Sequence, residues 1–223
     1  MRELFLRLLL ALILCICFGV LFGYIASAIS SESIVDFDRT VIDFVQGMET
    51  TWLTTALKGF TWIGSVYFVA PIGLLIVGYL YFKLHYRHQA VLFATVMIGT
   101  VVVNFLLKIY FKRERPEIHK IMEANGFSFP SGHTMMAFSL YAIIAYIAWR
   151  NVRTTLSRVL LFLFAVTMII VIGMSRIYLG VHFPSDVIGG LAASALWLTI
   201  AISVYAFYQD HQKKKLSSLN STP

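Results

Sequence analysis

The sequence predicts an all-α integral membrane protein, a bundle of six transmembrane helices with an interfacial helical segment on its outer face. Hydrophobic residues make up 59% of the 223 residues and charged residues only 13%, about half of the usual share in a soluble domain. The apolar residues gather in runs of about 20, the length that a helix needs to cross a bilayer. We therefore expect a single membrane domain over residues 1–209 and a polar, flexible cytoplasmic tail over residues 210–223.

Six apolar runs have a length that suits a membrane span. They lie near residues 8–29, 60–82, 90–111, 133–149, 158–174 and 185–207. The first run resembles a signal peptide, because Ala26-Ser27-Ala28 imitates a cleavage site, but it is longer than a usual signal-peptide core. Its removal would also leave an odd number of spans. We therefore expect it to form the first helix.

The segment between the first two runs, residues 30–58, mixes apolar and charged residues. This pattern favours a helix that lies in the membrane interface, and Trp52 and Trp62 are placed to act as anchors in the aromatic belt. The alternative interpretation is a lid over a site.

The distribution of Lys and Arg predicts the orientation in the membrane. With the N-terminus inside, ten of the 18 cations fall in inside segments and eight in outside segments. Six of those eight lie within residues 108–120 or at Arg176, the regions where the chemistry would need positive charge. With these six set aside, ten cations lie in inside segments and two in outside segments. The sequence thus predicts a multi-pass protein of the cell membrane with both termini in the cytoplasm. Because the cations lie in short breaks between apolar runs, the net charge of +7 does not indicate nucleic-acid binding.

A basic stretch follows the third apolar run. Lys108 and Arg115 are seven residues apart, about two helical turns, and Pro116 disfavours helical geometry at Arg115. The planar fork of Arg and the point charge of Lys both suit phosphate oxygens. The alternative for basic residues at a membrane edge is contact with lipid headgroups. We assign that role to Lys112, Arg113 and Lys120.

A second motif, Pro130-Ser131-Gly132-His133, opens the fourth run. Ser131 suits a helix N-cap, and Gly132 lets the backbone approach a ligand closely. Free backbone N–H groups at a helix start bind anions, and His133 would lie beside such an anion. The alternative is an ordinary helix start.

A third motif bridges the last two runs. Arg176 lies six residues before His182, Gly180 allows a turn between them, and Asp186 lies four residues after His182. Pro184 suits the first position of a helix, so that Asp186 falls in the first turn and can reach back to His182. An Asp–His pair fixes the imidazole tautomer and supports positive charge on the ring. The alternative is a capping Asp beside an unrelated His. In the predicted topology, all three motifs lie on the outer face.

The set K-x6-R-P, P-S-G-H and S-R-x5-H-x3-D resembles the signature of the type 2 phosphatidic acid phosphatase superfamily. This superfamily includes membrane lipid phosphatases and soluble vanadium haloperoxidases, and the hydrophobicity of the chain excludes the soluble class. Within the family, the sequence is most similar to bacterial phosphatidylglycerophosphate phosphatase B and to undecaprenyl pyrophosphate phosphatases.

The resemblance implies a metal-independent and cofactor-independent lipid phosphatase that acts through a phosphohistidine. His182 would be the nucleophile, Asp186 would orient and stabilise its ring, and His133 would protonate the leaving group. The phosphoryl oxygens would be held by Lys108, Arg115, Ser131, Gly132 and Arg176.

Several alternatives remain open from the sequence. A lipid phosphotransferase would use the same motifs, and phosphatidylglycerophosphate, undecaprenyl pyrophosphate and phosphatidic acid are all compatible substrates. A lipid transporter or scramblase is a different class, but such proteins place polar groups near the membrane midplane, whereas these spans are nearly free of charge. We expect the partners to be a lipid phosphate and the bilayer.

Overall fold

The computed structural model describes residues 2–117, 119–149 and 151–219, so that Arg150 and residues 220–223, both on the predicted cytoplasmic side, lie outside it. The described residues form helices and no strands, which confirms the predicted all-α class. In chain order the helices are α1 (Arg2–Ser30), α2 (Val35–Gln46), α3 (Thr51–Ile63), α4 (Val66–Gly78), a π-helical turn (Tyr79–Lys83), α5 (Arg87–Phe111), α6 (Gly132–Trp149), α7 (Thr155–Tyr178) and α8 (Pro184–Leu219).

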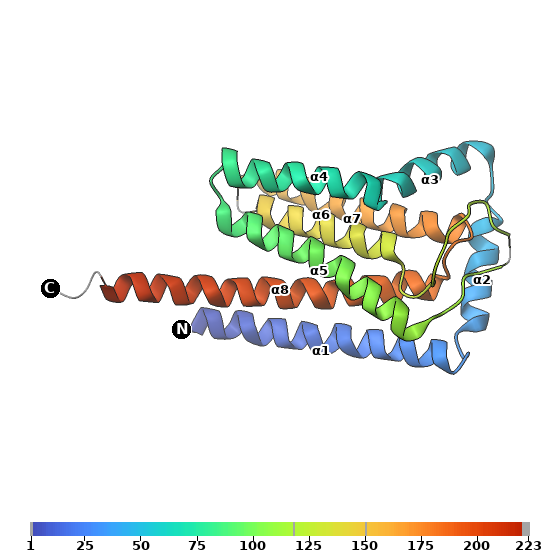
Figure 1. Cartoon of the computed structure of the whole chain (residues 1–223), viewed down its shortest axis with the longest axis horizontal. Coiled ribbons are helices and arrows are strands. Elements are labelled where there is room, and N and C mark those ends of the chain that lie inside the picture. The colour runs from blue at the N-terminus through green and yellow to red at the C-terminus, as the bar shows by residue number, and fades with distance from the viewer. Residues whose placement is uncertain (1, 118, 150, 220–223) are drawn as a thin grey trace.

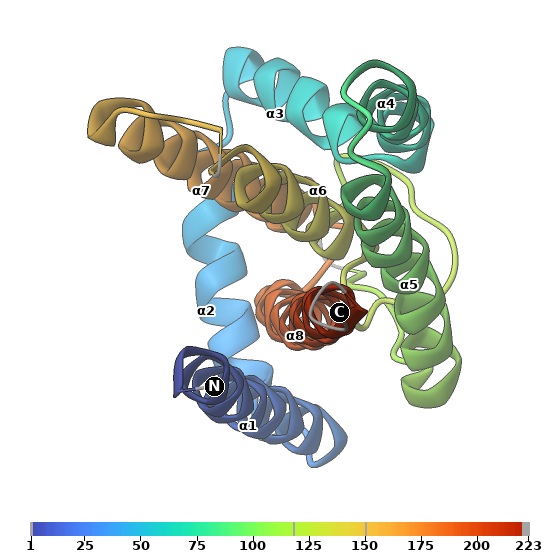
Figure 2. The ribbon, with the colours of Figure 1, turned by 90° about the vertical axis from the view of Figure 1, so that its left-hand side faces the viewer.

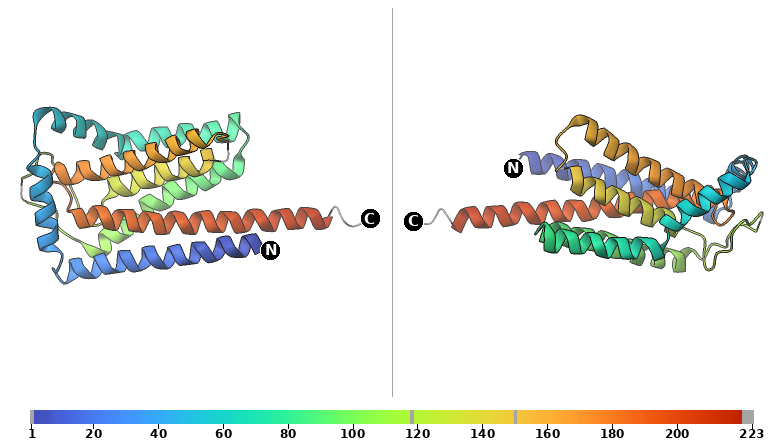
Figure 3. Two further views of the ribbon diagram at one scale, coloured as in Figure 1. Left: turned by 180° about the vertical axis from the view of Figure 1, so that it is seen from behind. Right: turned by 90° about the horizontal axis from the view of Figure 1, so that it is seen from above.

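Six of the described helices are long and apolar enough to cross a membrane, as the sequence predicts. These candidate spans are Phe5–Ser30, Val66–Lys83, Arg87–Phe111, Gly132–Trp149, Thr155–Tyr178 and Pro184–Gln212. They lie side by side along one direction, with α1 against α8, and the first turn of α1 lies at the same end of the bundle as the last turn of α8 (Figures 1 and 3).

The second span begins later than predicted, because the chain bends between α3 and α4. At Gly64, a Cβ atom would lie 2.5 Å from Cγ2 of Ile172 on α7. This close approach requires glycine, and α3 ends at Ile63 just before it. Residues 60–63 therefore belong to α3 and not to the membrane span.

The predicted interfacial segment consists of α2 and α3. Helix α2 lies across the end of the bundle opposite to the chain termini, and α3 leads from it back to α4 (Figures 1 and 2). Helix α2 packs against α7 and α8 and buries Asp38, Ile42 and Val45. Trp52 and Trp62 are exposed, as expected of anchors in the interface.

The last helix extends beyond its predicted end. At 36 residues, α8 measures about 54 Å at 1.5 Å per residue, against a hydrocarbon core of about 30 Å. Residues 210–219, which we expected to form part of a polar tail, continue α8. An ion pair between Lys214 and Asp210, 2.7 Å apart and one helical turn from each other, supports this extension.

The end of the bundle that carries α2 is held together by a hydrophobic cluster that joins α2 to the turn between α7 and α8. It comprises Ile42, Val45, Ile177, Tyr178, Leu179, Val181 and Val187. Gly180 in this turn has φ +70°, and a Cβ atom there would overlap the carbonyl oxygen of His119. The turn thus contacts the segment between α5 and α6 at His119 and at Ile121, whose N–H donates to the carbonyl oxygen of Leu179 at 3.2 Å.

Candidate active site

A cavity of about 300 Å³ gathers residues from all three motifs. Its walls consist of Lys108, Arg115, Met122, Glu123, Ala124, Asn125, Gly132, His133, Arg176 and His182. A larger cavity of about 1020 Å³ between α1 and helices α6 to α8 contains no motif residue. The smaller cavity is therefore the candidate site.

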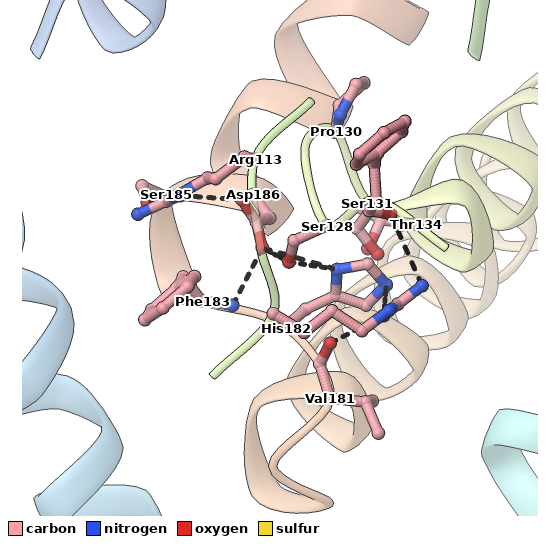
Figure 4. A network of polar contacts seen from close by, with 12 residues as sticks. Arg113, Ser128, Pro130, Ser131, Thr134, Val181, His182, Phe183, Ser185 and Asp186 are labelled. Atoms are coloured by element: carbon pink, nitrogen blue, oxygen red, sulfur yellow. Dashed lines mark hydrogen bonds and ion pairs between the residues drawn. The ribbon is translucent and has the colours of Figure 1, made fainter. Parts of the chain in front are cut away.

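His182 and Asp186 form a buried pair at the base of this cavity. The imidazole Nδ1 lies 3.3 Å from Oδ2 of Asp186, which also accepts a hydrogen bond from the backbone N–H of Phe183 at 2.9 Å (Figure 4). Burial lowers the pKa of His182 to about 3, although the hydrogen bond and charge of Asp186 oppose this shift. His182 is therefore neutral at pH 7.

The tautomer of His182 follows from its neighbours. Arg115 Nη1 lies 3.2 Å from Nε2 of His182, and a guanidinium can only donate hydrogen bonds. Nε2 must accordingly be the unprotonated nitrogen, and Nδ1 carries the proton that faces Asp186. This arrangement leaves the lone pair of Nε2 on the side of the ring that faces Arg115.

Arg115 itself is held in place by backbone carbonyl groups. Its guanidinium donates to the carbonyl oxygens of Val181 at 2.7 Å, Gly126 at 2.9 Å and Asn125 at 3.0 Å. These acceptors are neutral, and no carboxylate among the described residues forms an ion pair with the guanidinium, so that its positive charge is not cancelled by direct contact.

Lys108 and Arg176 complete the cationic wall. Lys108 Nζ donates to the carbonyl oxygens of Phe127 and Ser128. Arg176 is 2% exposed and donates from Nη1 to the hydroxyl of Thr61 on α3. Its Nε is buried and has no hydrogen-bond partner among the described residues. Burying a hydrogen-bond donor without an acceptor costs free energy. Nε of Arg176 is therefore a candidate donor to a bound ligand.

The second motif supplies the N-terminal end of α6. Gly132 and His133 line the cavity. A Cβ atom at Gly132 would lie 3.0 Å from Oδ1 of Asn104, so that glycine permits the close approach of α5. Ser131 is fully buried and its hydroxyl accepts from Thr134 at 2.9 Å. The structure therefore places Ser131 behind the cavity wall and not in it.

One prediction about the basic stretch was wrong. Lys112 and Lys120 are exposed, as expected of cations that face headgroups. The side chain of Arg113, in contrast, is only 13% exposed and forms ion pairs with Asp186 at 2.6 Å and with Asp38 at 2.8 Å. A buried carboxylate requires a partner, and Arg113 is the cation close enough to provide it.

The sequence analysis also missed residues that support the site. Ser128 donates to Oδ2 of Asp186 (Figure 4). Asp38 accepts from the backbone N–H of Ser185 at 2.8 Å and from its hydroxyl at 2.6 Å. Thr61 accepts from Arg176. None belongs to a motif. Asp38 lies 147 residues from Ser185, and Thr61 lies 115 residues from Arg176.

Comparisons with known proteins identify the family of this chain. The model of the PAP2 superfamily matches residues 89–210. Phosphatidylglycerophosphatase B from Bacillus subtilis is 29% identical over 176 residues, which cover 78% of this chain and 86% of the relative. A candidate undecaprenyl-diphosphatase of Escherichia coli, YbjG, is 31% identical over 115 residues, 49% of this chain and 54% of the relative.

A solved structure extends the likeness to the fold. The crystal structure of a transmembrane PAP2-type phosphatidylglycerolphosphate phosphatase from Bacillus subtilis superposes with a TM-score of 0.79 at 26% identity and covers 85% of this chain and 94% of the other. The family model alone spans more than half of the chain. This protein therefore belongs to the PAP2 superfamily, as the motifs predicted, and is a membrane-embedded hydrolase of phosphate esters.

Proposed function

We propose that the protein removes the terminal phosphate of a lipid, phosphatidylglycerophosphate or undecaprenyl pyrophosphate, through a phosphohistidine and without a metal or other cofactor. The observation that carries this proposal is the convergence of Lys108, Arg115 and Arg176 on a cavity that also contains His133 and His182. Three cations and two histidines suit a dianionic phosphate.

The unpartnered Nε of Arg176 supports the phosphate assignment. An oxygen of a bound phosphoryl group would accept this hydrogen bond and remove the cost of burying the donor. Lys108 and Arg115 would neutralise the remaining charge as it develops in the transition state. The described residues contain no group of three His, Cys, Asp or Glu side chains arranged to hold a metal ion, and the cations would supply the equivalent electrostatic stabilisation.

The reaction would proceed in two steps. Nε2 of His182 attacks phosphorus and forms an N–P bond, while the P–O bond to the lipid breaks and His133 gives a proton to the departing oxygen. Asp186 stabilises the positive charge on the ring of His182 across the 3.3 Å contact. His133 then takes a proton from water, which attacks phosphorus and breaks the N–P bond. The products are the dephosphorylated lipid, inorganic phosphate and neutral His182.

The choice of substrates rests on the position of the site and on the relatives. The cavity lies at the ends of the membrane helices, where a lipid phosphate can enter while its chains remain in the bilayer. The names of the two curated relatives give phosphatidylglycerophosphate and undecaprenyl diphosphate as their substrates. Both molecules carry a terminal phosphate on a long apolar body.

The distribution of Lys and Arg supports an extracytoplasmic site in the cell membrane, with both termini in the cytoplasm. A reporter that is active only outside the cytoplasm, fused after α8, should remain inactive. An active fusion would place the site in the cytoplasm.

Phosphate release from purified protein tests the proposal. Phosphatidylglycerophosphate, undecaprenyl pyrophosphate and phosphatidic acid are supplied separately in excess EDTA, with His182→Ala as the inactive variant and His211→Ala, an exposed histidine on α8, as the matched control. We expect release by the wild type and by His211→Ala only. Strict dependence on Mg²⁺, or full activity of His182→Ala, would contradict the mechanism.

The phosphohistidine is tested with substrate labelled at the terminal phosphate. Label should be retained by the wild type in an acid-labile, base-stable form and be absent from His182→Ala. His133→Ala should lose less activity toward p-nitrophenyl phosphate than toward a lipid, because nitrophenolate leaves without a proton. Transfer of label to a second acceptor instead of water would identify a phosphotransferase.

A further inference from the structure

Arg113 and Asp38 form a buried charge network behind the candidate nucleophile. Asp38 is 1% exposed and Asp186 is fully buried, and the guanidinium of Arg113 lies between them. Nη1 is 2.6 Å from Oδ1 of Asp186, and Nη2 is 2.8 Å from Oδ2 of Asp38. One cation thus bridges two buried carboxylates.

Arg113 determines which oxygen of Asp186 faces the imidazole. Oδ1 is occupied by Arg113, and Oδ2 is left to His182, Ser128 and the N–H of Phe183. The guanidinium also lies over the ring of Phe183, 4.1 Å from its centroid, which restrains its plane. Arg113 does not line the cavity, so that any effect on the reaction passes through Asp186.

Asp38 holds Arg113 from the opposite side and attaches α2 to α8. Its oxygens accept from the backbone N–H and hydroxyl of Ser185 at 2.8 and 2.6 Å. Ser185 precedes Asp186 in the first turn of α8, where a negative charge is favoured by the helix dipole. Helix α2 therefore contacts the residue next to Asp186 as well as its counter-ion.

We propose that Arg113 and Asp38 are positioning residues for the reaction and that the docking of α2 on the bundle completes the site. In this arrangement, Arg113 sets the rotamer of Asp186, and Asp38 sets the orientation of Arg113. The inference rests on the proposed role of His182 as nucleophile. It extends the site to a helix that carries none of the motif residues.

The test compares Asp38→Asn, Arg113→Gln and Arg113→Lys with the controls Asp36→Asn and Lys112→Gln, which alter exposed neighbours. Two quantities are measured: kcat for lipid phosphate release, and the inhibition constant of inorganic phosphate. Asp38→Asn should lower kcat about 10- to 150-fold, the range for a lost charge-assisted hydrogen bond. The inhibition constant should change less than about threefold, because Lys108, Arg115 and Arg176 are untouched.

The three network variants also predict an order. Arg113→Lys should retain more activity than Arg113→Gln, since it keeps the charge but cannot bridge both carboxylates. Asp38→Asn combined with Arg113→Gln should lower kcat by less than the product of the two single losses, since Asp38 acts in part through Arg113. Wild-type kcat in Asp38→Asn and Arg113→Gln, or equal losses of kcat and phosphate binding, would overturn the inference. His182→Ala is measured alongside, because its full activity would instead reject the proposed function.

Discussion

Replacement of Thr61 by Val tests whether α3 holds the phosphate-binding arginine. Thr61 is 5% exposed, and its hydroxyl accepts the hydrogen bond from Nη1 of Arg176. Valine has nearly the same shape but no acceptor. The substitution removes the acceptor of Nη1. Nε of Arg176 has no acceptor among the described residues even in the wild type.

The size of the effect follows from the kind of bond that is lost. A hydrogen bond to a charged group contributes about 1.5–3 kcal/mol, and each 1.36 kcal/mol corresponds to about a tenfold change in rate. We therefore expect kcat/KM for lipid phosphate release to fall about 10- to 150-fold. The assay is the initial rate of phosphate release in mixed micelles, with the thermal unfolding midpoint recorded for each variant.

Two matched variants make the result specific. Thr61→Ser keeps the hydroxyl and should retain most of the activity. Thr55→Val alters an exposed threonine on α3 whose hydroxyl bonds only within the helix, and it should behave as the wild type. If Thr61→Val stays within twofold of the wild type, Arg176 does not depend on α3 and the reasoning is refuted.

Three further predictions follow from the geometry. The pKa of His182 is about 3 in the folded protein and about 6.5 in the unfolded chain, so that protonation favours the unfolded chain and the protein loses stability as the pH falls from about 6.5 toward 3. Between pH 7 and pH 4.5, the thermal unfolding midpoint of the wild type should therefore fall more than that of His182→Gln. Equal falls would contradict the low pKa. Ser128→Ala removes a donor to Asp186 and should lower kcat about tenfold or more; an unchanged kcat would show that the hydroxyl is dispensable. A Cβ atom at Gly99 would overlap the ring of Trp197, so that Gly99→Ala should destabilise the protein by about 1–3 kcal/mol. Gly19→Ala should not destabilise it, because the described residues leave open space there. Equal thermal unfolding midpoints of the two variants would contradict this packing.

The sequence predicted the spans and the cavity well because both depend on local patterns. Apolar runs of sufficient length identify membrane helices wherever they occur, and the three motifs fall at helix ends on one side. Once the topology is known, Lys108, His133 and Arg176 have to lie at the same end of the bundle. The structure places all three in one cavity wall.

The supporting residues could not be predicted, because their roles depend on contacts between distant segments. In the sequence, Arg113 lies between Lys112 and Glu114, a pattern typical of exposed charged residues. Asp38 has the position of an acidic residue on the polar face of an interfacial helix. Only the docking of α2 on α8 buries both of them. The bend at Gly64 was missed for a related reason, since glycine is required there by Ile172 on another helix.

The position of Asp38 and Thr61 has a consequence for how far the catalytic unit can be separated from the rest of the chain. The family segment, residues 89–210, holds every motif residue. One acceptor of Arg113, Asp38 on α2, and the acceptor of Arg176, Thr61 on α3, lie before it. A fragment that starts at α5 would retain the complete signature and still lack both supports. Because Asp38 contacts Ser185 on the last helix, the contact between α2 and the site can form only after α8 has been made, and the onset of phosphate release would report the completion of assembly.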